Sequence, residues 1–164
     1  RDEQHLLGLW WGLQQGVVDI IGSDHAPHST EEKQQPYPNS PSGMPGVQTL
    51  LPVMLNHVSH GRLTLEHLVD LVATSPARLF GIIGKGRIAM GYDADFTLID
   101  LEQQREITDD WIESKCGWTP FNGESTTGWP VGTIIAGRSV MRDGELLGVA
   151  DGRPMKFFES ENAD

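Results

Sequence analysis

An aspartate and two histidines lie close together where an apolar run ends. Residues 17–21 are mostly branched and apolar, and Asp24 follows them. His25 and His28 come next, on either side of Pro27. In parallel α/β sheets, catalytic groups lie at the carboxyl ends of the strands, and this arrangement fits that position. We therefore expect Asp24 to bind a metal, to move a proton or to cap the following turn.

Carboxylate and imidazole side chains are suitable ligands for zinc. One aspartate with two histidines is only part of a zinc site, however, because such a site needs further ligands. On these residues alone a structural alternative stays open, in which Asp24 caps the turn and His28 is solvated.

The residues before Asp24 predict one repeat of an α/β protein. Apolar residues recur with helical spacing over residues 3–15, with Asp2 as N-cap and Gly16 just past the end. Residues 17–23 are short and nearly all apolar, which predicts a buried strand. Helix, short loop and strand in succession indicate the α/β class.

The residues after Asp24 predict a long loop and then helices. Residues 25–46 are rich in proline and lack periodicity, and a loop of this length in a compact domain is typically functional or disordered. Because it directly follows a predicted strand that ends in Asp24, we favour a functional loop. Helices are predicted over residues 47–58, from a cap at Thr64, and from Ser75, where Pro76 suits a first turn.

From residue 84 onward the chain is predicted to be mostly β. A turn-rich stretch over residues 84–95 leads to predicted strands at residues 96–100, 131–135 and 139–141, and Asp143-Gly144 predicts a hairpin turn. The predicted organisation is an α/β part over residues 1–83, a β part over 84–150, and a tail over 151–164.

Composition narrows the class of protein. A net charge of -11 argues against binding to nucleic acid. No apolar run approaches the roughly 20 residues of a membrane span, and no signal peptide is visible. The single cysteine, Cys116, fits a reducing compartment, so a cytoplasmic location is expected. Because the chain starts at Arg1 without a methionine, we expect it to come from a longer or processed product.

Five stretches together resemble the C-terminal part of a dihydroorotase, in the hydantoinase-like branch of the amidohydrolase superfamily. They are Gly22–His28, Glu31–Lys33, Ser42–Gly46, Ser75–Gly81 and Gly84–Asp95. The Asp-His-Ala-Pro-His segment with its downstream Gly-x-Pro-Gly is specific to dihydroorotases, whereas Gly-x-Asp-Ala-Asp is shared across the superfamily. The resemblance extends from residue 1 to about residue 145.

The resemblance implies a (β/α)8 barrel with a small β-sandwich beside it. Residues 17–24 would be the eighth barrel strand, and residues 3–15 the helix before it. Residues 47–81 would close the barrel, and residues 85–145 would form part of the sandwich.

The resemblance also implies an enzyme of pyrimidine biosynthesis. Dihydroorotases interconvert N-carbamoyl-L-aspartate and L-dihydroorotate, and one or two zinc ions polarise the carbonyl and activate water. Asp24 matches the family residue that ligates a metal and shuttles a proton between water and the amide nitrogen. A positioned carboxylate in such a role typically contributes ~10²–10⁴-fold in rate.

Four further residues match substrate-binding positions of the family. His28 matches the residue that hydrogen-bonds the free carboxylate of the substrate. Ser42 and Gly43 match positions whose backbone groups meet the substrate, and Ala26 lies near its ring. His25 matches no functional position and is interpreted as structural.

The chain lacks several features of the family. It contains no His-x-His pair, and nothing in it matches the carbamylated lysine, the two further metal-binding histidines or the substrate-binding arginine. We therefore expect the other metal ligands to lie outside this chain, and the chain alone to be inactive. The usual glutamate after Pro-Gly-x is Gln48 here, which predicts a changed helix cap.

Two alternatives stay open beside a dihydroorotase. The first is a related cyclic amidase, such as an allantoinase or a hydantoinase (dihydropyrimidinase). The second is a non-catalytic dihydroorotase-like chain that scaffolds aspartate transcarbamoylase. The expected partners are a small-molecule substrate, further copies of the chain and aspartate transcarbamoylase, without nucleic acid or membrane.

Overall fold

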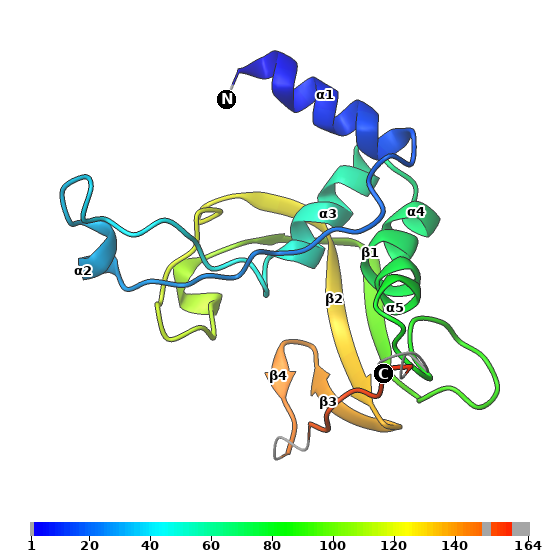
Figure 1. Ribbon diagram of the computed structural model, residues 1–164. Coiled ribbons are helices and arrows are strands. Elements are labelled where there is room, and N and C mark those ends of the chain that lie inside the picture. The colour runs from blue at the N-terminus through cyan, green and yellow to red at the C-terminus, as the bar shows by residue number, and fades with distance from the viewer. Residues whose placement is uncertain (1, 149–151, 159–164) are drawn as a thin grey trace, which may run out of the picture. The chain divides into compact units, whose positions relative to one another are not determined.

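A computed structural model of the chain describes residues 2–148 and 152–158 (Figure 1). The chain forms two compact units, each built from segments far apart in the sequence. The first comprises Arg1–Ile21, Leu63–Leu98 and Val131–Asp164, and the second comprises Gly22–Arg62 and Ile99–Pro130. The domain limits expected at residues 84 and 150 stay a prediction. Much of the expected tail over residues 151–164 lies outside the described residues.

Helix α1, Glu3–Gln14, opens the first unit and confirms the predicted helix. The side chain of Asp2 caps it by accepting a hydrogen bond of 3.1 Å from the backbone N–H of His5. Leu13 is buried, but most of the apolar face is open, since Leu6, Leu7 and Leu9 are each more than half exposed. Among the described residues, no helix is both long and apolar enough to cross a membrane.

The buried strand predicted over residues 17–23 does not form among the described residues. These residues run without a neighbouring strand among the described residues, and Val17 is 67% exposed. The backbone N–H of Ile21 donates to the carbonyl of Leu71 at 3.1 Å. A strand forms only where a second chain segment offers a ladder of N–H and C=O groups, which the apolar pattern alone does not supply.

The predicted helices at Thr64 and Ser75 form one continuous helical stretch. Helix α4, Leu65–Val69, is capped by Thr64, whose hydroxyl accepts from the backbone N–H of His67 at 3.2 Å. It passes through a π-helical turn, Asp70–Thr74, into α5, Ser75–Leu79. Pro76 lies next to this turn, and a proline removes one backbone donor from a regular helix.

A glycine lets the turn that follows α5 lie directly against the helical stretch. Gly86 has a φ of +87°, and a Cβ there would lie 2.5 Å from the Cβ of Ala77 and 2.9 Å from the carbonyl oxygen of Ala73. The hydroxyl of Thr74 donates to the Gly86 carbonyl at 3.1 Å. The turn is therefore fixed by close backbone packing that a side chain would block.

The Gly-x-Asp-Ala-Asp motif holds the same turn from its other end. The ammonium of Lys85 lies 2.9 Å from a carboxylate oxygen of Asp93 and also hydrogen-bonds the carboxylate of Asp95. The other oxygen of Asp95 accepts from the backbone N–H of Ala136 at 2.7 Å. These contacts show that the two aspartates of the motif stabilise the first unit.

The strands confirm the mixed α/β class. The sheet has the order β1-β2-β3-β4, and β2–β3 and β3–β4 pair antiparallel. The strands are β1, Phe96–Glu106, β2, Ser125–Ile135, β3, Arg138–Arg142, and β4, Glu145–Leu146. The predicted hairpin turn is confirmed, because Asp143 and Gly144 both have positive φ, 51° and 89°.

In the second unit, helix α3 packs against part of β2. Helix α3, Leu50–Ser59, begins three residues later than predicted. A Cβ on Gly128 of β2 would lie 2.8 Å from the Cβ of Leu55, so only a glycine allows this approach. The side chain of Asn56 accepts from the backbone N–H of Thr127 at 3.1 Å. Leu55, Ile107 and Trp129 are at most 2% exposed and form the core of this unit.

We predict that Asp95→Asn removes an acid-sensitive part of the stability. The hydrogen bond from the Ala136 N–H, and then the one from Lys85, lower the pKa of the Asp95 carboxyl below its ordinary value in the folded chain. Its stabilising contribution is therefore complete above the unfolded pKa and is lost as the pH falls through the folded pKa.

Urea unfolding of the full-length protein between about pH 5 and pH 3 measures this effect. Wild type should lose more stability over that range than Asp95→Asn, whereas Asp110→Asn, a change at an exposed aspartate, should behave like wild type. If the free energy of unfolding fell equally with pH in wild type and Asp95→Asn, Asp95 would not be the source of the acid-sensitive stability.

Candidate active site

The turn that carries Asp24 has an unusual backbone. Asp24 is exposed and has a φ of +45°, in the left-handed region that only glycine, asparagine and aspartate visit readily. Such conformations cost of order 1–3 kcal/mol and cluster at functional sites, where the surroundings enforce them. The left-handed backbone of Asp24 therefore agrees with the expectation that Asp24 is a functional residue.

A second loop of the same unit packs directly on this turn. The backbone of His25 pairs with that of Met44 in a parallel bridge, and the N–H of Ala26 donates to the Met44 carbonyl at 3.0 Å. Gly43 has a φ of +108°, and a Cβ on it would lie 2.7 Å from the carbonyl oxygen of Ala26. The structure thus brings Ala26 and Gly43 together, with Ser42 adjacent in the chain.

The imidazole of His25 ties the end of the second loop to the turn. Its Nδ1 accepts hydrogen bonds from the backbone N–H groups of Gly46, at 3.1 Å, and Val47, at 3.3 Å. A ring nitrogen that accepts carries no proton, so these donors assign the remaining proton to Nε2. His25 has the structural contacts that its interpretation required.

His28 is held from two sides. Its Nδ1 lies 3.5 Å from a carboxylate oxygen of Glu32, which also accepts from the backbone N–H of Ser29 at 2.8 Å. Glu32 and Ser29 form a capping box at the start of α2, Thr30–Lys33. The ring is 31% exposed, and with Nδ1 facing Glu32 its Nε2 is the nitrogen left for a ligand.

Sequence reasoning missed the second support of His28. The indole Nε1 of Trp118 donates to the backbone carbonyl of His28 at 2.7 Å, across 90 residues of sequence. A tryptophan N–H that is shielded from water needs a hydrogen-bond acceptor. The sequence therefore predicts some acceptor for Trp118, but it does not identify the carbonyl of His28.

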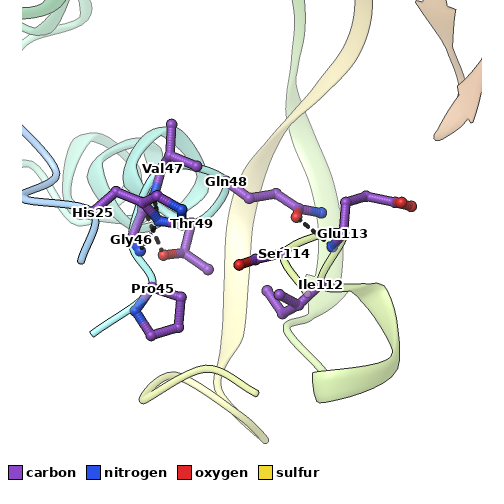
Figure 2. Close-up of a pocket in the computed structure, with 9 residues that line it drawn as sticks. All are labelled: His25, Pro45, Gly46, Val47, Gln48, Thr49, Ile112, Glu113 and Ser114. Carbon is purple, nitrogen blue, oxygen red and sulfur yellow. Dashed lines mark hydrogen bonds between the residues drawn. The ribbon is translucent and has the colours of Figure 1, made fainter. Parts of the chain in front are cut away.

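A cavity of about 210 Å³ lies beside the second loop (Figure 2). His25 and residues 45–49 line one side and Ile112, Glu113 and Ser114 the other, with Gln48 reaching across. The five predicted site residues do not line it: Asp24, Ala26, His28, Ser42 and Gly43.

The changed helix cap predicted at Gln48 is wrong. Residue Thr49 occupies the N-cap position of α3, and Gln48 instead bridges to the short 3-10 helix Asp109–Trp111 and the residues after it. Its Nε2 donates to the carbonyl of Trp111 at 2.7 Å, and its Oε1 accepts from the N–H of Glu113 at 2.9 Å. An amide has both a donor and an acceptor, so it satisfies both groups at once.

The residues of the candidate site include a suitable metal ligand, but they are too few to hold a metal ion. Asp24 offers the carboxylate oxygens that zinc accepts. In the described part of the chain, however, no three side chains of His, Cys, Asp or Glu gather closely enough to hold an ion. A metal centre that uses Asp24 needs ligands that these residues do not provide.

Comparison with known proteins identifies the family. The model of the amidohydrolase family matches residues 2–140. The chain belongs to the amidohydrolase family. The predicted resemblance to dihydroorotases is confirmed by curated members of this family. The dihydroorotase of Methanothermobacter thermautotrophicus is 50% identical over 130 residues, which is 79% of this chain and 30% of that protein. The dihydroorotase of Methanosarcina mazei is 38% identical over 98% of this chain and 35% of that protein.

Solved amidohydrolase structures have the same fold as this chain. An L-hydantoinase (dihydropyrimidinase) from Arthrobacter aurescens superposes with a TM-score of 0.86 at 36% identity, over 90% of this chain and 34% of that structure. A D-hydantoinase from a Thermus species gives 0.85 at 32% identity, over 91% and 34%. The chain therefore spans about a third of the length of the relatives that it matches.

We predict that Gln48→Glu destabilises the second unit. A glutamate can still accept from Glu113, but it cannot donate to the Trp111 carbonyl and sets an anionic oxygen against it. Leaving a buried acceptor unpaired costs about 1–3 kcal/mol, and the part-buried Trp111 carbonyl should cost less than that full amount. The expected result is a lower urea midpoint for the full-length variant at neutral pH.

Gln104→Glu is the matched control, because Gln104 is exposed on β1 and undergoes the same change of charge. If both variants unfolded at the wild-type midpoint, the bridge would contribute nothing to stability.

Proposed function

We propose that this chain is the C-terminal part of a zinc-dependent dihydroorotase, which interconverts N-carbamoyl-L-aspartate and L-dihydroorotate. The observation that carries the proposal is the packing of the turn Asp24–His28 on the loop that contains Ser42 and Gly43. All five residues expected to act on the substrate lie in that turn or in that loop. The curated relatives named dihydroorotase support this choice of substrate.

The proposal includes a (β/α)8 barrel to which residues 1–83 contribute the last helix and strand. Two features of the first unit support it: the open apolar face of α1, and residues 17–21, which pair with no strand among the described residues. An apolar face and an unpaired extended segment are what barrel elements present when their neighbours are supplied by other parts of a polypeptide. The remaining sheet would belong to the small β-sandwich over residues 84–150.

Asp24 is the proposed proton carrier. In the hydrolytic direction, the oxygen of water adds to the ring amide carbon while the Asp24 carboxylate takes the proton. The C–N bond then breaks, and Asp24 returns the proton to the leaving nitrogen. In the direction of ring closure the same transfers run in reverse. An exposed carboxylate at the mouth of a barrel can reach both atoms.

His28, Ala26, Ser42 and Gly43 are the proposed substrate-binding residues. The imidazole of His28 would hydrogen-bond the free carboxylate of the substrate through Nε2, since Nδ1 faces Glu32. The backbone groups of Ser42 and Gly43 would meet the substrate, because neither residue carries a bulky side chain. Ala26 would lie next to the ring, where a larger residue would collide.

Asp24 would also be one ligand of the metal centre, whose other ligands would come from outside this chain. Zinc supplies polarisation of the amide carbonyl and makes water a stronger nucleophile at neutral pH. This assignment agrees with the expectation that the chain alone is inactive. The proposal further includes a cytoplasmic enzyme that forms homo-oligomers, with aspartate transcarbamoylase as a further partner.

A hydantoinase or dihydropyrimidinase is the second candidate. The similarity to the Arthrobacter aurescens L-hydantoinase favours it. Assays of the full-length protein on dihydroorotate, allantoin, hydantoin and dihydrouracil decide between the candidates. Turnover of dihydroorotate alone supports the proposal. Turnover of allantoin, hydantoin or dihydrouracil without dihydroorotate would instead identify a related cyclic amidase. An upstream sequence without a His-x-His pair, together with no turnover, would favour the non-catalytic scaffold.

We predict that Asp24→Asn in the full-length enzyme lowers turnover of dihydroorotate by more than about a hundredfold, because an amide cannot carry the proton. The circular dichroism spectrum should stay unchanged, because asparagine tolerates the same backbone conformation. Asp110→Asn serves as the control for loss of one exposed charge. Near-normal turnover in Asp24→Asn would refute the proton-carrier role.

We predict that His28→Ala mainly weakens substrate binding. Loss of a hydrogen bond to a charged group corresponds to an increase in KM of about tenfold or more, with a smaller change in kcat. Steady-state kinetics with dihydroorotate measure both, and His5→Ala, at a histidine 69% exposed on α1, is the control. A KM like that of the wild type would count against recognition of the carboxylate.

A further inference from the structure

Lys33 binds the main chain on both sides of Ser42. Its ammonium donates to the carbonyl of Pro41 at 2.8 Å and to the carbonyl of Gly43 at 3.0 Å. The side chain comes from the last residue of α2 and is partly buried. The ion pairs found among the described residues do not involve Lys33, so its charge serves these two carbonyl groups.

Two carbonyl contacts fix the orientation of two peptide planes. Because a trans peptide is planar, its N–H points opposite to its carbonyl. With the carbonyls of Pro41 and Gly43 turned toward Lys33, the N–H groups of Ser42 and Met44 must point away from it. Lys33 therefore determines which backbone groups of this loop face the side remote from α2.

The rest of the loop is fixed by contacts that do not involve the ammonium. Gly43 lies against Ala26, with no room for a side chain, and the N–H groups of Gly46 and Val47 donate to His25. The hydroxyl of Ser40 donates to the backbone carbonyl of Lys33 at 3.0 Å. Residues 41–43 thus have one strong side-chain anchor in the described structure, and it is the Lys33 ammonium.

We propose that Lys33 is a positioning residue: by holding the peptide before Ser42 and the peptide after Gly43, it sets the backbone that these two residues present to the substrate. This inference rests on the proposed function, which assigns those backbone groups to substrate binding. Hydrogen bonds from a charged donor are stronger than those between neutral groups, so one lysine can hold a loop that has no regular structure. Lys33 itself does not touch the substrate.

Steady-state kinetics of full-length variants test the role. Lys33→Met keeps the length of the side chain and removes the donor. It should raise KM for dihydroorotate by about tenfold and leave kcat within about twofold. Lys33→Arg keeps a charged donor with a different shape, so its KM should lie between those of Lys33→Met and wild type. Lys115→Met, at an exposed lysine of the same unit, should leave both constants unchanged.

Hydrogen exchange of the loop amides separates the inference from the proposed function. The hydrogen-bonded amides of this loop contact, those of Ala26 and Gly46, should exchange faster in Lys33→Met and at the wild-type rate in Lys115→Met. Unchanged exchange in Lys33→Met overturns the inference, and so does faster exchange with a normal KM for dihydroorotate. If wild type does not turn over dihydroorotate but the loop still loosens in Lys33→Met, the proposed function fails and the anchoring role stands. Lys33→Gln replaces Lys33→Met in both measurements if the methionine variant does not fold.

Discussion

The candidate site depends on one constraint: residue 43 must be a glycine, which has no side chain. Gly43 lets its loop approach the backbone of Ala26 so closely that a Cβ would lie 2.7 Å from a carbonyl oxygen. That approach allows the bridge between His25 and Met44, and the bridge holds the segment in which Asp24 has its left-handed backbone. Any larger residue would push the two segments apart and release the conformation of the aspartate.

Polar side chains then secure both partners of this contact without using the predicted reactive groups. His25 accepts from the end of the loop, and Lys33 donates to its beginning. Trp118 holds the far end of the turn through the carbonyl of His28. Each of these bonds satisfies a main-chain group in an irregular segment, where no helix or sheet can do so. The result is an irregular site whose main-chain groups are held by side chains.

Local features could be predicted from the sequence, and features that depend on distant partners could not. The cap at Asp2, the cap at Thr64 and the hairpin turn at Asp143 rest on neighbouring residues, and all three are observed. The strand over residues 17–23 failed because an apolar pattern does not supply a pairing partner. The role of Gln48 failed for a similar reason, since its partners lie 63 and 65 residues away. The proximity of Ala26 to Gly43 followed only from the family resemblance, because no local rule connects two loops.

The bond between Trp118 and His28 has a consequence for synthesis of the chain on the ribosome. The two residues are 90 positions apart, so the turn that carries Asp24 leaves the ribosomal tunnel long before its indole donor exists as polypeptide. At about 5–20 residues per second, this interval lasts several seconds. During that time the nascent turn must rely on contacts with residues up to 47, and its final shape is reached only after the later strands have emerged.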